Sequence, residues 1–120
     1  MTDETETCDL LCLDLPKAEA LRHALPPGDE LEAAVLPFKA LTDPTRVAVL
    51  LSLADGQSAC VCDLAWIVGR DEKLVSHHAR ALRVAGLVGA TRDGKMVMYE
   101  LTDRGRALLS AVTAGREVRA

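Results

Sequence analysis

The stretch CVCDLAWIVGRDEKLVSHHARALRVAG, residues 60–86, decides the fold. We expect one helix over residues 62–68, ended by Gly69, and a longer one over residues 72–85, capped by Asp71. Glycine commonly follows the last residue of a helix, and aspartate commonly precedes the first. Because only a short turn separates the two helices, the stretch predicts a helix-turn-helix.

Downstream of this motif the sequence predicts a hairpin. We expect strands over residues 87–92 and 95–101, joined by Asp93-Gly94, because Asp-Gly between two strand-like runs favours a tight turn. The hairpin would be the wing of a winged helix. A final helix is expected over residues 103–114, with apolar positions at Leu108, Leu109 and Val112.

Upstream, Asp43-Pro44 marks the start of another helix, since aspartate is a preferred N-cap and proline is favoured in the first turn. This helix is expected to reach Ala54. Its buried positions are expected to be Val47, Leu50 and Leu51.

Two further helices are expected near the N-terminus. The first spans residues 16–25 and has Pro16 in its first turn. The second spans residues 29–41 and contains Pro37, which predicts a kink or a restart there. Its apolar face is expected to consist of Leu31, Val35, Phe38 and Leu41.

Together these elements predict a mainly α fold with a β-hairpin wing (α+β), a winged helix-turn-helix. The 120 residues fit one domain but give a small core, so we expect a homodimer that shares apolar surface. Residues 1–28 are expected to be a flexible N-terminal segment with metal ligands and a short helix. Residues 29–115 are expected to bind DNA and to dimerise, and residues 116–120 to form a tail.

The charges are divided unevenly along the chain, whose net charge is −4. Residues 1–36 hold nine acidic and two basic residues, whereas residues 70–106 hold eight basic and five acidic ones. The basic residues therefore gather where a DNA-binding face is expected. We find no membrane-spanning run and no signal peptide, so we expect a cytoplasmic protein.

Six side chains are candidates for DNA contact. Four lie on one stripe of the expected 72–85 helix, where they can reach base edges or phosphates, and two flank the hairpin tip. The inward positions of that helix are expected to be Leu74, Val75, Ala81 and Leu82, and His78 is equally suited to packing or to DNA contact. The six candidates are Lys73, Ser76, His77, Arg80, Arg92 and Lys95.

Four cysteines form two close pairs, Cys8 with Cys12 and Cys60 with Cys62. In a cytosolic chain such pairs favour metal binding or redox sensing over structural disulfides. Residues two apart point away from each other in a regular helix or strand, so Cys60 and Cys62 converge only where the backbone turns, as at a helix start. Such a position also favours the thiolate form of Cys60. Four thiolates would select soft or borderline ions such as Cd(II), Pb(II) or Zn(II).

The combined motifs resemble the ArsR/SmtB family of metal-sensing winged-helix repressors. The similarity lies in residues 41–46 (Leu-Thr-Asp-Pro-Thr-Arg), residues 60–65, Ser76-His77-His78, residues 85–88 and Gly94-Lys95. With the N-terminal pair, the chain is most similar to CadC-type cadmium/lead sensors. The resemblance implies a dimer that binds operator DNA without metal and releases it with metal. It further implies that Cys8 and Cys12 of one subunit join Cys60 and Cys62 of the other.

The resemblance also concerns a second metal site, on the final helix at the dimer interface. Asp103 matches its first ligand, but Gly105 stands where a histidine is usual, and no histidine follows His78. We therefore expect this interfacial zinc site to be absent and Asp103 to be a helix cap.

Several alternatives stay open from the sequence. The same fold could respond to arsenite or antimonite, which prefer three thiolates, or to oxidation of the cysteine pairs. The chain could also be a metal-binding or thiol-exchange protein with no role at DNA. An enzyme is not expected, because the sequence has no glycine-rich phosphate loop and no Ser/His/Asp or paired-carboxylate grouping.

Overall fold

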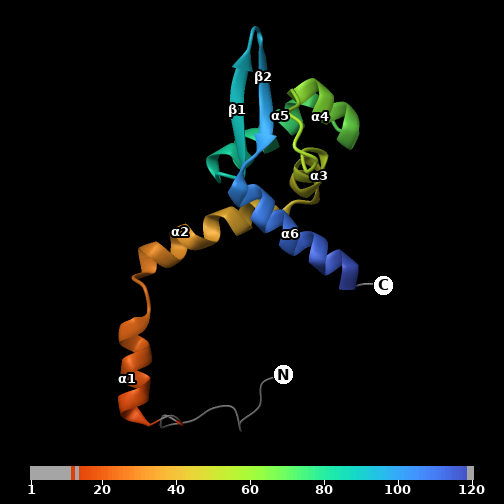
Figure 1. The fold of residues 1–120 in the computed structure, drawn as a ribbon. Helices are drawn as coiled ribbons and strands as arrows, with labels where there is room; N and C mark the ends of the chain where they lie inside the picture. The colour runs from red at the N-terminus through yellow and green to blue at the C-terminus, as the bar shows by residue number, and fades with distance from the viewer. Residues whose placement is uncertain (1–11, 13, 119–120) are drawn as a thin grey trace. The chain divides into compact units, whose positions relative to one another are not determined.

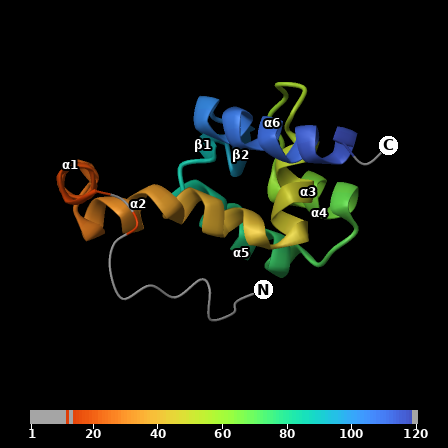
Figure 2. The same ribbon diagram turned by 90° about the horizontal axis from the view of Figure 1, so that it is seen from below.

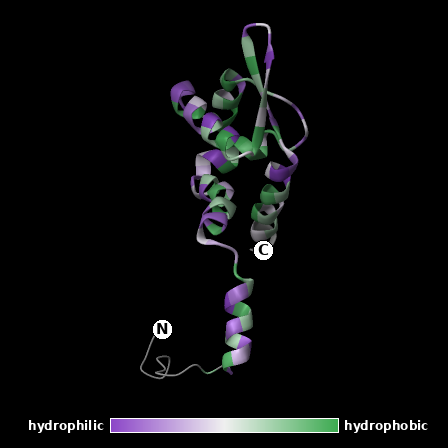
Figure 3. Ribbon diagram, turned by 90° about the vertical axis from the view of Figure 1, so that its left-hand side faces the viewer, coloured by the Kyte–Doolittle hydropathy of each residue, from purple (hydrophilic) through white to green (hydrophobic). Residues whose placement is uncertain are grey.

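The computed structural model describes residue 12 and residues 14–118, with side chains as far as residue 115. The chain divides into two compact units between Ala33 and Ala34. Figure 1 labels the helices and strands along the chain. Within the first unit, α1 (Leu15–Ala24) starts where Asp14 accepts a hydrogen bond from Lys17 N (2.8 Å), with Pro16 in the first turn as expected. None of its residues is buried, and hydrophilic and hydrophobic segments alternate along it (Figure 3).

The next helix, α2 (Gly28–Lys39), crosses the boundary between the units. It continues through Pro37, which is buried, and passes into a 3-10 turn, η2 (Ala40–Thr42). Three residues of the expected apolar face are exposed: Leu31, Val35 and Phe38 are 46%, 45% and 55% accessible to solvent. The fourth, Leu41, lies in η2, is half-buried and packs against the core.

Asp43 caps α3 (Pro44–Ser52) by accepting a hydrogen bond from Thr45 N (2.7 Å), as the Asp-Pro signal predicts. The helix ends two residues before the expected Ala54. The prediction of its buried positions was partly wrong. Leu50 is buried, but Leu51 is 39% exposed and Val47 is half-buried, because Val49 and the C-cap Leu53 take the inward positions.

The helix-turn-helix consists of α4 (Val61–Val68) and α5 (Glu72–Val84). Gly69 ends α4 in the left-handed region (φ 70°), where glycine is favoured, and Asp71 caps α5 through Lys73 N and Leu74 N. The prediction that Leu74 faces inward was wrong, since it is 39% exposed. The inward face of α5 consists of Val75, His78, Ala79 and Leu82.

The wing is an antiparallel pair, β1 (Val88–Asp93) and β2 (Met96–Leu101). Asp93 pairs with Met96, so the two-residue turn is Gly94-Lys95, one residue later than expected. Gly94 has φ 65°, which suits glycine.

The last helix, α6 (Asp103–Val118), extends beyond the expected end at Ala114 and packs against α3 (Figure 2). Its cap is not Asp103, as expected, but Thr102. The Thr102 hydroxyl accepts from Gly105 N (3.0 Å) and donates to the Gly86 carbonyl (2.7 Å). The start of α6 is thereby fixed to the turn between α5 and β1.

The core of the second unit joins η2, α3, α4, α5, both strands and α6. Its fully buried large side chains come from α3 and its cap, α4, α5 and the start of the wing: Val49, Leu50, Leu53, Leu64, Val75, Leu82 and Leu87. This core holds the helix-turn-helix and the wing in fixed positions.

Candidate nucleic-acid interface and cysteine pair

The outward face of α5 carries the four side chains expected to reach DNA. Lys73, His77 and Arg80 are exposed and Ser76 is half-buried. Their spacing of three, four and seven residues places them on one side of the helix, since a helix repeats every 3.6 residues. Asp71 caps the first turn of α5 and thereby fixes where the helix, and with it this face, begins.

The wing presents the two remaining candidates. Arg92 lies on β1 opposite Val97, and Lys95 lies in the turn; both are exposed. Together with the exposed residues of α5 they form what we call the basic face: Lys73, His77, Arg80, Arg92 and Lys95. Whether these side chains contact DNA stays a prediction.

Cys60 occupies the position expected from the sequence, the N-cap of α4, with an extended backbone (φ −86°, ψ 171°). It is buried, and its thiol donates to Asp63 Oδ2 (3.3 Å). Cys62, two residues later, is exposed, and its thiol donates to Oε1 of Glu72 (3.5 Å). Since Glu72 is the first residue of α5, one cysteine of the pair contacts the start of the recognition helix.

The surroundings of Cys62 favour its protonated form. The hydrogen bond to Glu72 and the negative charge of Glu72 raise the pKa of the Cys62 thiol, and Cys60 adds to the rise. A helix start is expected to lower a thiol pKa, but at Cys62 the neighbouring carboxylate outweighs that effect.

The segment before Cys60 is hydrogen-bonded to the wing. Ala59 N donates to the Tyr99 carbonyl (3.0 Å), and Tyr99 N donates to the Ala59 carbonyl (2.8 Å). Residues 59–62 therefore touch both elements that carry the basic face: the wing through Ala59, and α5 through Cys62.

Of the two N-terminal cysteines, the structure describes Cys12 alone. Cys8 lies outside the described residues, and Cys12 is exposed in the first unit. Among residues 12 and 14–118, no group of three or more His, Cys, Asp or Glu side chains is arranged to hold a metal. A four-cysteine site therefore stays a prediction.

The structure explains why glycine occupies position 105. A Cβ atom on Gly105 would overlap the Leu87 carbonyl oxygen and lie 2.9 Å from Leu101 Cδ1. A histidine therefore cannot be placed there without moving α6. The absence of an interfacial zinc site stays a prediction.

One polar cluster was missed by the sequence analysis. His78 is 5% exposed, and its Nδ1 accepts a hydrogen bond from Arg46 Nε (2.9 Å). Its Nε2 lies 3.8 Å from Asp43 Oδ2. The sequence does contain the parts of this cluster: Arg46 three residues after the helix-capping Asp43, and His78 on the inward face of α5. Their contact could not be predicted, because it depends on how α3 and α5 pack.

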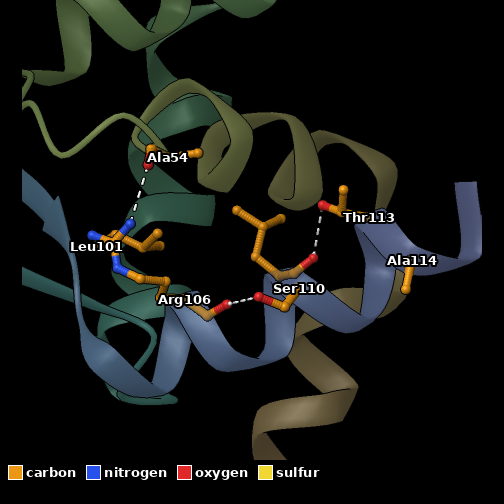
Figure 4. A pocket seen from close by; sticks show the side chains of 7 residues that line it. Ala54, Leu101, Arg106, Ser110, Thr113 and Ala114 are labelled. Atoms are coloured by element: carbon orange, nitrogen blue, oxygen red, sulfur yellow. Dashed lines mark hydrogen bonds between the residues drawn. The ribbon is translucent and has the colours of Figure 1, made fainter. Parts of the chain in front are cut away.

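A pocket beside α6 shows no sign of a ligand site (Figure 4). Arg106 crosses it to donate to the Ala54 carbonyl (3.1 Å). The Ser110 and Thr113 hydroxyls donate to carbonyl groups one turn earlier in α6. These polar groups are thus used within the fold.

Comparisons with known proteins agree with this geometry. A family model described as "Bacterial regulatory protein, arsR family" matches residues 43–89, from the cap of α3 to the start of the wing. The cadmium resistance transcriptional regulatory protein CadC of Listeria innocua is 31% identical over 94 residues, which are 78% of each chain. A putative arsenical resistance operon repressor of Halobacterium salinarum is 34% identical over 119 residues, covering 97% of this chain and 92% of the relative.

Solved structures show the same architecture. A homodimeric winged helix-turn-helix DNA-binding domain from Mycobacterium bovis, described as "a possible ArsR-family transcriptional regulator", matches with a TM-score of 0.64 and 25% identity. The match covers 90% of this chain and 91% of that one. No helix among the described residues combines the length and the apolar character needed to cross a membrane.

Proposed function

Since the chain belongs to the ArsR family of bacterial regulatory proteins, we propose that it is a homodimeric, metal-responsive transcriptional repressor. Without metal it binds operator DNA. Binding of Cd(II) or Pb(II), with Zn(II) as a third candidate, releases the DNA. The metal ligands would be the thiolates of Cys8, Cys12, Cys60 and Cys62.

Operator binding is supported by the basic face. The α5 helix has the position of a recognition helix, and its exposed Lys73, His77 and Arg80 can reach a major groove. The wing residues Arg92 and Lys95 would contact the phosphate backbone. Dimerisation is supported by the exposed apolar residues of α2 and by the homodimeric state of the Mycobacterium bovis domain.

The proposed switch rests on two contacts of residues 59–62: Ala59 pairs with Tyr99 of the wing, and the Cys62 thiol bonds to Glu72 of α5. A metal drawn to Cys60 and Cys62 displaces the Cys62 thiol proton and therefore the hydrogen bond to Glu72. It also acts on Ala59, which is paired with the wing. A coupling of about 3 kcal/mol through these contacts would lower operator affinity roughly a hundredfold.

The soft ligands support cadmium and lead, and the CadC relative is a regulator of cadmium resistance. Arsenite is the second candidate inducer, because the Halobacterium salinarum relative is a putative arsenical resistance repressor and matches nearly the whole chain. Arsenite needs only three thiolates, so one of the N-terminal cysteines would not be required for it.

The central experiment titrates the reduced protein with Cd(II) and measures thiolate-to-metal absorption and operator release together. We expect both to end at one ion per subunit. Cys60→Ser should keep operator binding, since serine is a preferred N-cap residue for α4, but should lose release by Cd(II). Mg(II), which prefers oxygen ligands, serves as the control ion.

Each outcome of the titration has a clear meaning. If Cys60→Ser still releases DNA at normal Cd(II) affinity, the cysteine pair is not the sensor. If arsenite releases the DNA and Cd(II) does not, the inducer is the second candidate. If the reduced wild-type protein does not bind its own promoter at any salt concentration, the repressor function is wrong.

A further inference from the structure

The buried histidine of the recognition helix contacts the start of α3 through both of its ring nitrogens. His78 faces inward from the middle of α5 and is 5% exposed. Its Nδ1 accepts from Arg46 Nε at 2.9 Å. Arg46 lies in the first turn of α3, whose N-cap is Asp43, and Asp43 Oδ2 lies 3.8 Å from His78 Nε2. One imidazole ring thus connects α5 to the start of α3.

This arrangement fixes the protonation state of the ring. An imidazole nitrogen that accepts a hydrogen bond carries no proton, so the proton of neutral His78 lies on Nε2, facing Asp43. Protonation of Nδ1 would remove the acceptor and place a second positive charge beside Arg46. The hydrogen bond between α3 and α5 therefore exists only while His78 is neutral.

The neighbours of His78 act in opposite directions. Burial of the ring lowers the pKa of His78; the negative charge of Asp43 raises it, and the positive charge of Arg46 and the neighbouring His77 lower it further. The net direction is downward, so His78 is neutral near pH 7. Asp43 stays ionised there, because the hydrogen bond from Thr45 N lowers the pKa of Asp43.

A change at His78 reaches the candidate DNA-binding face directly. His77 follows it on α5, and the two ring centroids are 5.6 Å apart. The backbone between them belongs to the same helical turn, so a rotation of α5 that relieves His78 also turns His77 and its neighbours Ser76 and Arg80.

We propose that His78 is a positioning residue that holds the recognition helix at its DNA-binding angle through the hydrogen bond from Arg46, and that protonation of His78 releases this helix and weakens operator binding. Operator affinity is then sensitive to acid as well as to metal. The inference rests on the proposed operator binding, but it concerns α3 and α5 rather than the cysteines.

The sign of the pH effect follows from the direction of the shift. In the unfolded chain a histidine takes up its proton near pH 6.5, and native His78 takes it up at lower pH. The native protein therefore loses stability as the pH falls below 6.5, and the loss stops growing below the native pKa. In the same way, DNA binding that requires neutral His78 weakens as the pH falls through the native pKa, by at most about tenfold per pH unit for one proton.

The test compares operator affinity from pH 8 to pH 5.5 for the metal-free wild type and for His78→Asn. Asparagine offers its side-chain oxygen near the position of Nδ1 but cannot be protonated in this range. We expect similar affinities at pH 8 and a decline with acid in the wild type alone. Because His23 and His77 are present in both proteins, the difference between the two profiles belongs to His78.

A second variant removes the donor of the hydrogen bond. Arg46→Met leaves His78 without its partner on α3 at every pH. Operator affinity should therefore already be reduced at pH 8 and should decline less with acid than in the wild type. Circular dichroism at each pH confirms that the compared proteins are folded, which separates a loss of affinity from a loss of fold.

NMR of the imidazole nitrogens tests the same inference without DNA. The metal-free protein should show the Nε2–H form of His78 at pH 7, and its titration should move the amide signals of Ser76 and His77 together. A charged His78 at pH 7, or a titration that leaves those amides unmoved, overturns the inference. Parallel pH profiles of operator affinity for the wild type and His78→Asn also overturn the inference, but they leave the proposed repressor function intact. Failure of the wild type to bind DNA at any pH counts against the repressor function itself.

Discussion

At the scale of single residues, the contact between Cys62 and Glu72 makes a prediction about thiol chemistry. Glu72 raises the pKa of the Cys62 thiol by its hydrogen bond and by its charge. Glu72→Gln removes the charge, so the pKa of Cys62 should fall. The pH dependence of alkylation by iodoacetamide, followed at Cys62 by mass spectrometry, should then shift to lower pH.

A matched control for this variant is Glu100→Gln on β2, since Glu100 is not among the groups that shift Cys62. It should leave the alkylation profile unchanged. An unchanged profile in Glu72→Gln would show that the carboxylate does not govern the thiol, and the link from Cys62 to α5 would lose its support.

Some residue positions were predictable because their signals are local. The N-cap position of Cys60 followed from the need for the backbone to turn between two cysteines, and Asp43, Asp71 and Gly69 followed from capping preferences. Thr102 was missed as the cap of α6 because Asp103 is an equally good candidate by composition. The choice depends on the Gly86 carbonyl, which only tertiary packing brings near.

At the scale of elements, α6 can be tested with two glycines of the same helix. Gly105 lies against the Leu87 carbonyl and Leu101, whereas a Cβ on Gly115 would meet no heavy atom within 4 Å. Gly105→Ala should lower the free energy of unfolding by about 1–3 kcal/mol, because the helix must move to admit a methyl group. Urea denaturation at pH 7 measures the change.

Gly115→Ala is the control and should act in the opposite direction. Alanine has a higher helix propensity than glycine, so we expect a gain of about 0.5–1 kcal/mol if this part of α6 is helical in solution. Equal stability of Gly105→Ala and the wild type would contradict the close approach of α6 to Leu87.

The helices and the hairpin were largely predictable, whereas their inward faces were less so. A capping aspartate marks the starts of α1, α3 and α5, and the Asp-Gly pair marked the hairpin to within one residue. On α3 the prediction chose Val47 and Leu51, but the core takes Val49. The continuous apolar run at residues 47–51 offers several possible buried faces, and only the position of the neighbouring elements selects one.

At the scale of the whole molecule, the basic face predicts how operator binding depends on salt. Each phosphate contact releases counterions, so the logarithm of affinity falls with the logarithm of salt concentration by about 0.9 per contact. Because each substitution removes one contact from each subunit of the dimer, Arg92→Gln and Lys95→Gln should each make this slope shallower by about 2. Each should weaken binding to all DNA sequences alike. Fluorescence anisotropy between 50 and 300 mM salt, roughly the range where counterion release dominates, gives the slopes.

Lys17→Gln on α1 is the control for these variants, since it removes the same charge from the acidic N-terminal part of the chain. Its slope should equal that of the wild type. If Lys17→Gln changes the slope as much as Arg92→Gln does, binding depends on net charge rather than on the wing.

The arrangement of distant parts was the least predictable feature. The sequence placed two cysteine pairs about fifty residues apart, but nothing local determines whether they meet, and the structure describes Cys12 and Cys60 in different units. The Arg46–His78 contact was missed for the same reason, since its partners lie 32 residues apart in the sequence. Long-range contacts of this kind depend on the fold as a whole.

The contact between Gly105 and Leu87 also restricts how this regulator could diverge. A descendant that gained histidine at position 105 would lose the close packing of α6 against Leu87 before the histidine could serve as a metal ligand. Selection would therefore remove this single variant. Directed evolution toward a zinc response on α6 should therefore first loosen the turn at residues 86–88, and libraries that vary position 105 alone should yield no zinc-responsive clones.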